Sequence, residues 1–381
     1  MAVSGGDNPF HLRIRKENAE LADMCGKRVL VAMSGGVDSS VAAFLLKEAG
    51  YRVAGVTMYL AGEPSGRGAS GHVTADAVRD AKRVCEELGI RHHVFDYTDE
   101  LERWVIGPFL REYARGRTPN PCILCNRHLK FGSLLARMRG WGFDALATGH
   151  YAIIEKRGSR YSLIRHGDRR KDQTYFLSRI EPEALRWILF PLGPYTKEEV
   201  RAIADRSGLP VAAKAESQDV CFVYGGTYHD FLRERMGEQK GGRMVNRKGH
   251  CLGNHKGIVC YTVGQRGGLG ISHPVPLYVL RIDADKNEIV VGERGELLER
   301  ELIAGDLNLF RSEWPETVQA KIRYRRQASP CRVSSLGASR LRVRFQEEQE
   351  AITPGQSVVF YDGDEVLGGG IIEEVVHGDR G

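Results

Sequence analysis

Apolar residues in the first half of the chain fall into short runs that alternate with segments of helical spacing. The run 28–33 is almost wholly apolar, as strands buried on both faces of a parallel sheet are, and 51–60 is expected to be a second strand. The segments 39–50 and 74–89 carry apolar residues at helical spacing and end in glycine, with Thr74 opening the second. The pattern therefore predicts the order strand, helix, strand, helix.

Further strands are expected at 91–97 and within 144–156. Strands separated by helices predict an α/β fold with a doubly wound parallel sheet, in which ligands bind at the C-terminal ends of the strands. We expect this domain to occupy residues 27–213.

The pattern changes after this domain. Residues 214–275 are rich in glycine and polar residues, with helical spacing chiefly at 227–236, and are expected to form a small central domain. Residues 276–381 contain short β-like runs separated by turn signals such as Asp362-Gly363, which predicts a C-terminal β-barrel domain. The runs are 276–283, 287–292, 318–325, 340–345, 356–363 and 366–376.

Composition narrows the function classes only slightly. The chain has 55 Lys and Arg against 49 Asp and Glu, a net charge of +6 that permits a polyanionic partner without requiring one. No apolar run reaches the roughly 20 residues that cross a bilayer, so no membrane partner is expected. The polar tail 1–26 lacks the apolar core of a secretory signal and is assigned no function. We therefore expect a cytoplasmic protein whose eight cysteines lie in a reducing compartment.

The string Ala32–Ser40, Ala-Met-Ser-Gly-Gly-Val-Asp-Ser-Ser, joins the first strand to its helix. Gly35 and Gly36 let backbone N–H groups approach an anion, and the helix N-terminus adds its dipole. Asp38 beside phosphates is expected to hold Mg²⁺ or to orient the loop. The lysine-bearing GxxxxGK[ST] loop is not present. Two glycines alone would fit a turn in any α/β protein, whereas the full Ser-Gly-Gly-x-Asp-Ser string resembles the loop of enzymes that split ATP into AMP and pyrophosphate.

Six further motifs make the resemblance more specific. They are GRTPNPCILCNRHLKFG at 116–132, ATGHYA at 147–152, KDQTYFLSRI at 171–180, ESQDVCFV at 216–223, YTVGQRGGLGI at 261–271 and TPGQSVVFYDG at 353–363. Together with the phosphate loop they resemble the tRNA-specific 2-thiouridylases, over about residues 27–372. These enzymes replace O2 of uridine at the first anticodon position with sulfur.

The resemblance implies a role for each matching position. Cys125 is expected to be the nucleophile, and Cys221 the carrier of a persulfide. The implied ATP site is Ala32, Met33, Ser34, Gly35, Gly36, Val37, Asp38, Ser39, Met58 and Gly149. The implied contacts are Asn120, Pro121 and Cys122 for the target base, and His150, Lys171, Asp172, Gln173, Arg323, Tyr324 and Gln356 for the rest of the tRNA. The implied partners are the tRNAs for Glu, Gln and Lys, and a cysteine desulfurase or sulfur-relay protein.

The Cys122-x-x-Cys125 pair has its own chemistry. A thiolate is a strong nucleophile and sulfur carrier once its pKa is lowered. The segment after Cys125 has a helical pattern, so we expect the thiol near a helix N-terminus with Arg127, His128 and Lys130 nearby, all of which favour the thiolate. Structural zinc is disfavoured because no second pair occurs at ribbon spacing. A thioredoxin-like redox pair is disfavoured because the phosphate loop implies a different sheet.

Two mechanisms fit these cysteines. In the favoured one, Cys221 bears the persulfide, and Cys125 helps to deliver the sulfur and closes a disulfide with it. In the other, Cys122, Cys125 and Cys221 hold a [4Fe–4S] cluster whose fourth iron binds sulfide. Some family members carry Asp at the position of Cys122, where it has been assigned an acid/base role, and no other residue here stands out as a substitute.

Two alternatives lie outside tRNA thiolation. An amidating ATP pyrophosphatase, such as an NAD, GMP or argininosuccinate synthetase, would use the same loop but would not need paired cysteines. A non-catalytic tRNA-binding protein that senses ATP or iron would not release pyrophosphate. The intact phosphate loop and Cys221 argue against the second alternative.

Overall fold

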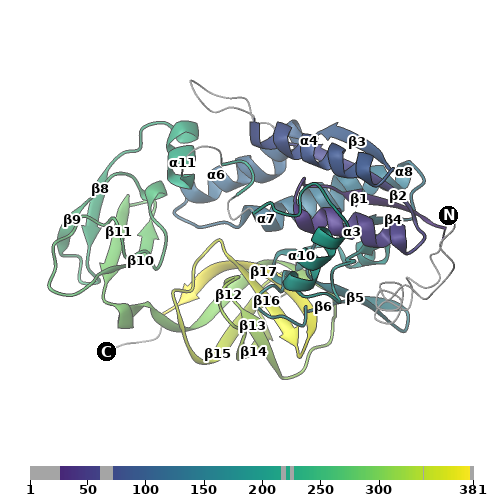
Figure 1. Cartoon of the computed structure of the whole chain (residues 1–381). Helices are drawn as coiled ribbons and strands as arrows, with labels where there is room; N and C mark the ends of the chain where they lie inside the picture. Colours follow the sequence, from purple (N-terminus) through teal and green to yellow (C-terminus); the bar gives the residue numbers. More distant parts are fainter. Residues whose placement is uncertain (1–25, 61–71, 216–219, 224–226, 338, 378–381) are drawn as a thin grey trace. The chain divides into compact units, whose positions relative to one another are not determined.

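The computed structural model describes residues 26–60, 72–215, 220–223, 227–337 and 339–377 (Figure 1). Two compact units are formed from non-contiguous stretches of chain. The first contains Met1–Glu102, Cys125–Phe222 and Asp364–Val366, and the second contains Arg103–Leu124, Val223–Gly363 and Leu367–Gly381. Within the described ranges, no helix is long and apolar enough to cross a bilayer.

The first unit is built on a parallel sheet with the strand order β3-β2-β1-β4-β7. The bounds are β1 Arg28–Ala32, β2 Arg52–Tyr59, β3 Arg91–Asp96, β4 Ala145–Ala147 and β7 Ile188–Leu189. The first strand lies centrally, and the chain leaves it toward β2 and β3 and later returns to β4 on its other side. This order confirms the predicted doubly wound α/β fold.

Three helices share one hydrophobic core with this sheet. They are α3 Val37–Glu48, α4 His72–Glu87 and α10 Lys197–Arg206. Val29 and Val31 of β1 are fully buried in that core, and α10 packs beside α3 (Figure 1). α4 begins two residues before Thr74, so the predicted start of this helix was wrong. α10 begins with a capping box in which Thr196 and Glu199 satisfy each other's backbone N–H groups.

The cysteine segment forms a helix of unusual pitch. The short helix α7 Pro121–Leu124 is followed directly by the π-helix η2 Cys125–Leu134 and then by α8 Leu135–Gly140. In the wider turn of η2 the Ser133 hydroxyl donates to the carbonyl of His128, five residues earlier, at 3.2 Å. π-Helices are rare and often occur at functional sites.

Shorter elements complete the first unit. They are α5 Thr98–Leu101, the hairpin strands β5 Ile153–Arg157 and β6 Arg160–Ile164, α9 Thr174–Leu177 and the 3-10 helix η3 Pro182–Trp187. Glu365 pairs in register with Ile164 of β6. The π-helix η1 Glu102–Ile106 follows α5 and continues into α6 Gly107–Ala114 of the second unit.

The second unit contains a small sheet of strand order β10-β11-β8-β9. Its elements are α11 Tyr228–Met236, β8 Gly242–Val245, β9 Cys251–His255, the 3-10 helix η4 Ile258–Cys260, β10 Tyr278–Asp283, β11 Glu288–Gly292 and the 3-10 helix η5 Arg294–Leu297. The helix expected at 227–236 is confirmed, and Thr227 caps it. The strands β10 and β11 pair with each other, and β11 also pairs with β8.

The same unit contains a closed six-stranded barrel of order β12-β15-β14-β13-β16-β17, in which β12 also pairs with β17. Its strands are β12 Leu298–Leu309, β13 Thr317–Lys321, β14 Ser329–Ser335, β15 Leu341–Glu350, β16 Ser357–Asp362 and β17 Glu365–Val376. Val343, Phe360 and Leu367 are fully buried inside it. The barrel is confirmed, and it begins at Leu298. The domain boundaries after residues 213 and 275 stay predictions.

The strand expected at 318–325 is correct only as far as Lys321. Residues 322–326 form a turn instead. There the Arg323 guanidinium donates to the carbonyls of Val263 and Ala351, at 3.0 and 2.9 Å, and to the Thr353 hydroxyl. Hydrogen bonds to these remote groups fix the turn, although the local pattern alternates like a strand.

Candidate active site

Hydrogen bonds within the phosphate loop hold its shape at the C-terminal end of β1. The Ser34 N–H donates to the Ser39 hydroxyl oxygen at 3.2 Å, and the Ser39 and Ser40 hydroxyls donate to the Gly36 carbonyl. Gly35 has a φ of +69°, and a Cβ there would lie 2.5 Å from the carbonyl oxygen of Ala77 in α4. Only glycine fits both constraints.

Gly149, which follows β4, lies directly against this loop. A Cβ at this position would lie 2.7 Å from the Ser39 nitrogen and 3.0 Å from the Asp38 Cβ, so the two backbones touch. Met58 is half-buried near the end of β2, the strand on the other side of β1. The structure thus brings Gly149 to the loop and places Met58 at the matching end of a neighbouring strand.

Asp38 is held by two residues that the sequence did not single out. Its Oδ1 accepts a hydrogen bond from the Tyr151 hydroxyl at 2.8 Å and forms an ion pair with the Lys197 ammonium at 2.6 Å. Tyr151 is 2% exposed and Lys197, the first residue of α10, is 5% exposed. Of the two expected roles for Asp38, orienting the loop is the one that these contacts serve.

A second lysine reaches the loop from further along the chain. The Lys214 ammonium donates to the Gly35 carbonyl at 3.0 Å and to Asp80 of α4 at 2.7 Å. Sequence reasoning missed both lysines because no motif marks them. The one available signal was the absence of a lysine within the loop, which implies that a cation comes from elsewhere.

Cys125 does not lie at a helix N-terminus, because α7 precedes it. Its side chain is 6% exposed. Burial raises the pKa of the Cys125 thiol, and the charge of Lys130 acts against that rise. The expectation of a stabilised thiolate was therefore wrong for the unliganded chain, since desolvation disfavours the charged form. Arg127 lies 3.5 Å from Glu181, so part of its charge is used in an ion pair.

The His150 ring contacts two aromatic rings, with centroid distances of 5.9 Å to Phe131 and 5.8 Å to Phe190. Its Nδ1 lies 2.7 Å from the Thr148 hydroxyl. Burial, and then the charge of Lys130, hold the pKa of His150 well below its ordinary value. A lowered pKa favours the neutral ring near pH 7.

Comparisons with known proteins match most of the chain, between residues 27 and 372. A family model described as the tRNA methyl transferase HUP domain matches residues 27–225, more than half of the chain. Models described as the tRNA methyl transferase PRC-barrel domain and the aminomethyltransferase beta-barrel domain match 229–293 and 299–372. The tRNA-specific 2-thiouridylase MnmA 1 of Syntrophus aciditrophicus is 54% identical, over 92% of this chain and 94% of that protein. The chain belongs to the tRNA-specific 2-thiouridylase family.

Other members of the 2-thiouridylase family match similar shares of the chain. MnmA of Geobacter metallireducens is 48% identical over 93% of this chain and 98% of its own, and MnmA of Carboxydothermus hydrogenoformans is 49% identical over 91% and 98%. Among solved structures, the U34-tRNA thiolase NcsA from Methanococcus maripaludis with its [4Fe–4S] cluster has a TM-score of 0.37 at 20% identity, covering 56% of this chain and 66% of that one. That likeness is too weak to bear on the cluster.

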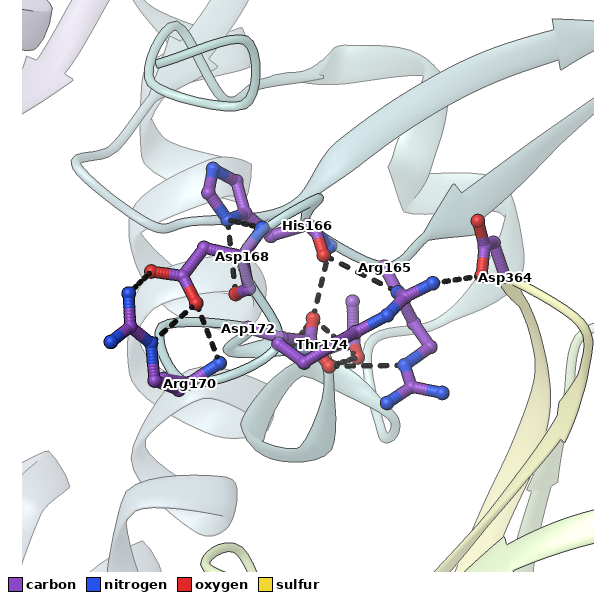
Figure 2. A network of polar contacts seen from close by, with 8 residues as sticks. Arg165, His166, Asp168, Arg170, Asp172, Thr174 and Asp364 are labelled. Carbon is purple, nitrogen blue, oxygen red and sulfur yellow. Dashed lines mark hydrogen bonds and ion pairs between the residues drawn. The ribbon is translucent and has the colours of Figure 1, made fainter. Parts of the chain in front are cut away.

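Lys171, Asp172 and Gln173, which the 2-thiouridylase resemblance assigned to tRNA, lie in one loop. The Asp172 carboxylate organises this loop (Figure 2). The Asp172 carboxylate accepts hydrogen bonds from the Thr174 hydroxyl at 2.9 Å, the His166 N–H at 3.2 Å and Arg165 Nε at 3.4 Å. It is fully buried. As a direct contact to tRNA it is therefore a poor fit, whereas its half-buried neighbours Lys171 and Gln173 are more accessible.

The remaining residues assigned to tRNA lie in the second unit. The Gln356 amide donates to the Thr118 carbonyl at 3.0 Å, and the Thr118 N–H donates to the Pro354 carbonyl. Gln356 therefore supports the extended segment that leads to Asn120. The Asn120 side chain accepts from the Cys122 N–H at 3.1 Å at the start of α7. Pro121 is buried, whereas Cys122 is exposed.

Arg323 and Tyr324 lie in the turn after β13. The Arg323 guanidinium is committed to the three oxygens described above, and the Lys321 ammonium lies 5.3 Å from the centre of the half-buried Tyr324 ring. These contacts give Arg323 a structural role in addition to any contact with RNA.

Cys221 is exposed in a turn, and residues 216–219 of its motif lie outside the described residues. In the parts of the chain that the structure describes, no group of three or more His, Cys, Asp or Glu side chains is arranged to hold a metal ion.

Proposed function

We propose that the chain uses ATP to replace O2 of uridine 34 in tRNA with sulfur that Cys221 carries as a persulfide. Membership of the 2-thiouridylase family supports the reaction. The observation that carries the ATP step is the loop at the end of β1, where Gly35, Gly149 and the Asp38–Lys197 pair form a glycine-lined cradle at the N-terminus of α3.

The first step would activate the base. O2 of the uracil attacks the α-phosphorus of ATP, the bond to the β-phosphate breaks, and pyrophosphate leaves. Mg²⁺ would accompany ATP, bound mainly by phosphate oxygens and water, because Asp38 already accepts from Tyr151 and Lys197. The backbone N–H groups of the loop would hold the phosphates.

Sulfur transfer would follow. The terminal sulfur of the Cys221 persulfide attacks C2 of the activated uracil, and AMP leaves. The Cys125 thiolate then attacks the Sγ of Cys221, which releases 2-thiouridine and leaves a disulfide that an external thiol reduces. The exposure of Cys221 supports loading by a donor protein, and the burial of Cys125 supports a nucleophile that acts only once substrate is bound.

The finer assignments are also proposals. We propose the tRNAs for Glu, Gln and Lys as substrates and a cysteine desulfurase or relay protein as donor. A cytoplasmic location stays a prediction. The alternative with a [4Fe–4S] cluster on Cys122, Cys125 and Cys221 predicts the same product but a requirement for iron.

The test is mass spectrometry of nucleosides from an unmodified tRNA transcript incubated with iron-free protein, Mg²⁺-ATP and a persulfide donor. We expect 2-thiouridine from the wild type and from Cys251→Ser, a control at another exposed cysteine, and none from Cys125→Ser or Cys221→Ser. Product only after anaerobic cluster reconstitution would replace the persulfide mechanism with the cluster mechanism. No product under either condition would refute thiolation.

A further inference from the structure

The phosphate loop has no lysine of its own, yet two lysine ammonium groups lie against it. Phosphate loops of the GxxxxGK[ST] type carry a lysine that reaches the β- and γ-phosphates. A loop without one offers a triphosphate backbone N–H groups, serine hydroxyls and a helix dipole, but no cation of its own. The two lysines therefore raise the question of which one meets the phosphates.

Lys197 is a poor candidate. It is 5% exposed, and its ammonium lies 2.6 Å from Asp38 Oδ1. Removing it from Asp38 would leave a partly buried carboxylate without its cation at the start of α3, which costs free energy. Lys197 is better suited to hold the loop in shape.

Lys214 differs in each respect. Its side chain is 39% exposed, and it touches the loop itself through the Gly35 carbonyl at 3.0 Å. An ammonium group has three N–H donors, and the contacts to Gly35 and Asp80 use two. The third can be given to an anion in the loop without breaking either contact.

We propose that Lys214 binds the pyrophosphate portion of ATP, and so supplies from outside the loop the cation that the loop lacks. The inference rests on the proposed use of ATP. Asp80, which is 25% exposed, holds the Lys214 ammonium beside Gly35 while no phosphate is bound. The Asp80 carboxylate would repel a bound polyphosphate, so the lysine and the aspartate have opposite effects on anion binding.

The opposite effects give a sharp test by calorimetric titration of the full chain with Mg²⁺-pyrophosphate and, separately, with AMP. Lys214→Met should weaken pyrophosphate binding about 10- to 100-fold, the usual effect of losing a hydrogen bond to a charged group, and should leave AMP binding unchanged. Lys214→Arg should retain most of the pyrophosphate affinity. Asp80→Asn should keep or raise that affinity.

Lys82→Met is the matched control, because it removes one positive charge from the exposed face of α4 without touching the loop. Pyrophosphate affinity unchanged in Lys214→Met would overturn the proposal while leaving ATP use intact. Equal weakening in Lys214→Met and Asp80→Asn would also overturn it, because the pair would then only hold the loop. Absence of both ATP and pyrophosphate binding in the wild type would refute this inference and the ATP step of the proposed function together. If Lys214→Met does not fold, Asp80→Asn carries the test, and weaker pyrophosphate binding in that variant overturns the proposal.

Discussion

Gln173 and Tyr151 exchange two hydrogen bonds. The Gln173 N–H donates to the Tyr151 carbonyl at 3.0 Å, and the Gln173 side-chain oxygen accepts from the Tyr151 N–H at 2.9 Å. The Tyr151 hydroxyl then reaches Asp38 in the phosphate loop. One buried tyrosine therefore joins the loop at 171–173, which we expect to meet tRNA, to the loop that we expect to hold ATP.

Tyr151→Phe should lower kcat/KM for ATP about 10-fold, with little change in folding. The variant keeps the ring but removes the hydroxyl that donates to Asp38, so that only the Lys197 ammonium still holds the carboxylate. The carboxylate and the start of α3 are then less well fixed. Pyrophosphate release in the presence of tRNA measures the effect. Tyr161→Phe, at a half-buried tyrosine of β6, is the control. An unchanged kcat/KM would mean that Lys197 alone suffices to orient Asp38.

Cys125 should be alkylated by iodoacetamide more slowly than Cys122 and Cys221, which are exposed. Because burial raises the pKa of the Cys125 thiol and Lys130 lowers it, the alkylation rate should rise with pH above the ordinary range of a cysteine. Lys130→Met should shift that pH profile further upward, and Lys130→Arg should not. Peptide mass spectrometry over pH 6 to about 10 follows each site separately. A profile unaffected by Lys130→Met would mean that Lys130 does not lower the pKa of the Cys125 thiol.

Lys171 and Asp172 should separate tRNA binding from stability. Asp172→Ala leaves the donors of His166 and Thr174 buried without their acceptor, and should cost about 2–4 kcal/mol of unfolding free energy. Lys171→Ala should weaken tRNA binding several-fold and leave the urea midpoint within error. Equal stability of Asp172→Ala and wild type would contradict the organising role given to Asp172.

Glu365 should make a pH-dependent contribution to stability. Burial tends to raise its pKa, but hydrogen bonds from Arg160 and Ser162 and the charges of Arg160 and Arg157 outweigh burial, so the pKa lies below the usual 4.5. A carboxyl with a lowered folded-state pKa stabilises the fold above its unfolded pKa, and this contribution is lost as pH falls through the folded pKa. Glu365→Gln should therefore be less stable than wild type at pH 7 by about 1 kcal/mol, since both arginines are partly exposed.

The difference between the two proteins should narrow as the pH falls below 4.5, the point at which Glu365 of the unfolded chain takes up its proton. Urea unfolding of both proteins at a series of pH values gives this difference directly. A gap that stays constant down to pH 3 would mean that packing, not charge, accounts for it.

Strands buried on both faces were the easiest part of the fold to predict. β1 and β2 read as apolar runs because helices cover both sides of a parallel sheet. β14, with the sequence SPCRVSS, was missed because only the side chain of Cys331 is fully buried, and the remaining residues are exposed or half-buried. Such a strand forms because its neighbours β13 and β15 pair with it, and no local pattern records that.

The site was predictable where one short string carried the chemistry. The phosphate loop is such a string, and the structure adds that Gly149 lies against it. Lys197 lies 159 residues along the chain from Asp38, and Lys214 lies 179 residues from Gly35. Only the topology of the fold brings these lysines to the loop. The expected thiolate at Cys125 failed for a similar reason, because its burial depends on tertiary packing that neighbouring cations in the sequence do not reveal.

The wide turn that begins at Cys125 also sets the angular position of that thiol. In η2 the backbone takes more residues per turn than an α-helix does, so the segment holds residues that an α-helix of the same span would not contain. A segment of the same ten residues with the α-helical pitch of about 3.6 residues per turn would turn Cys125 to a different angle relative to α8. The direction of the thiol is thus encoded by the pitch of the backbone as well as by the residue type.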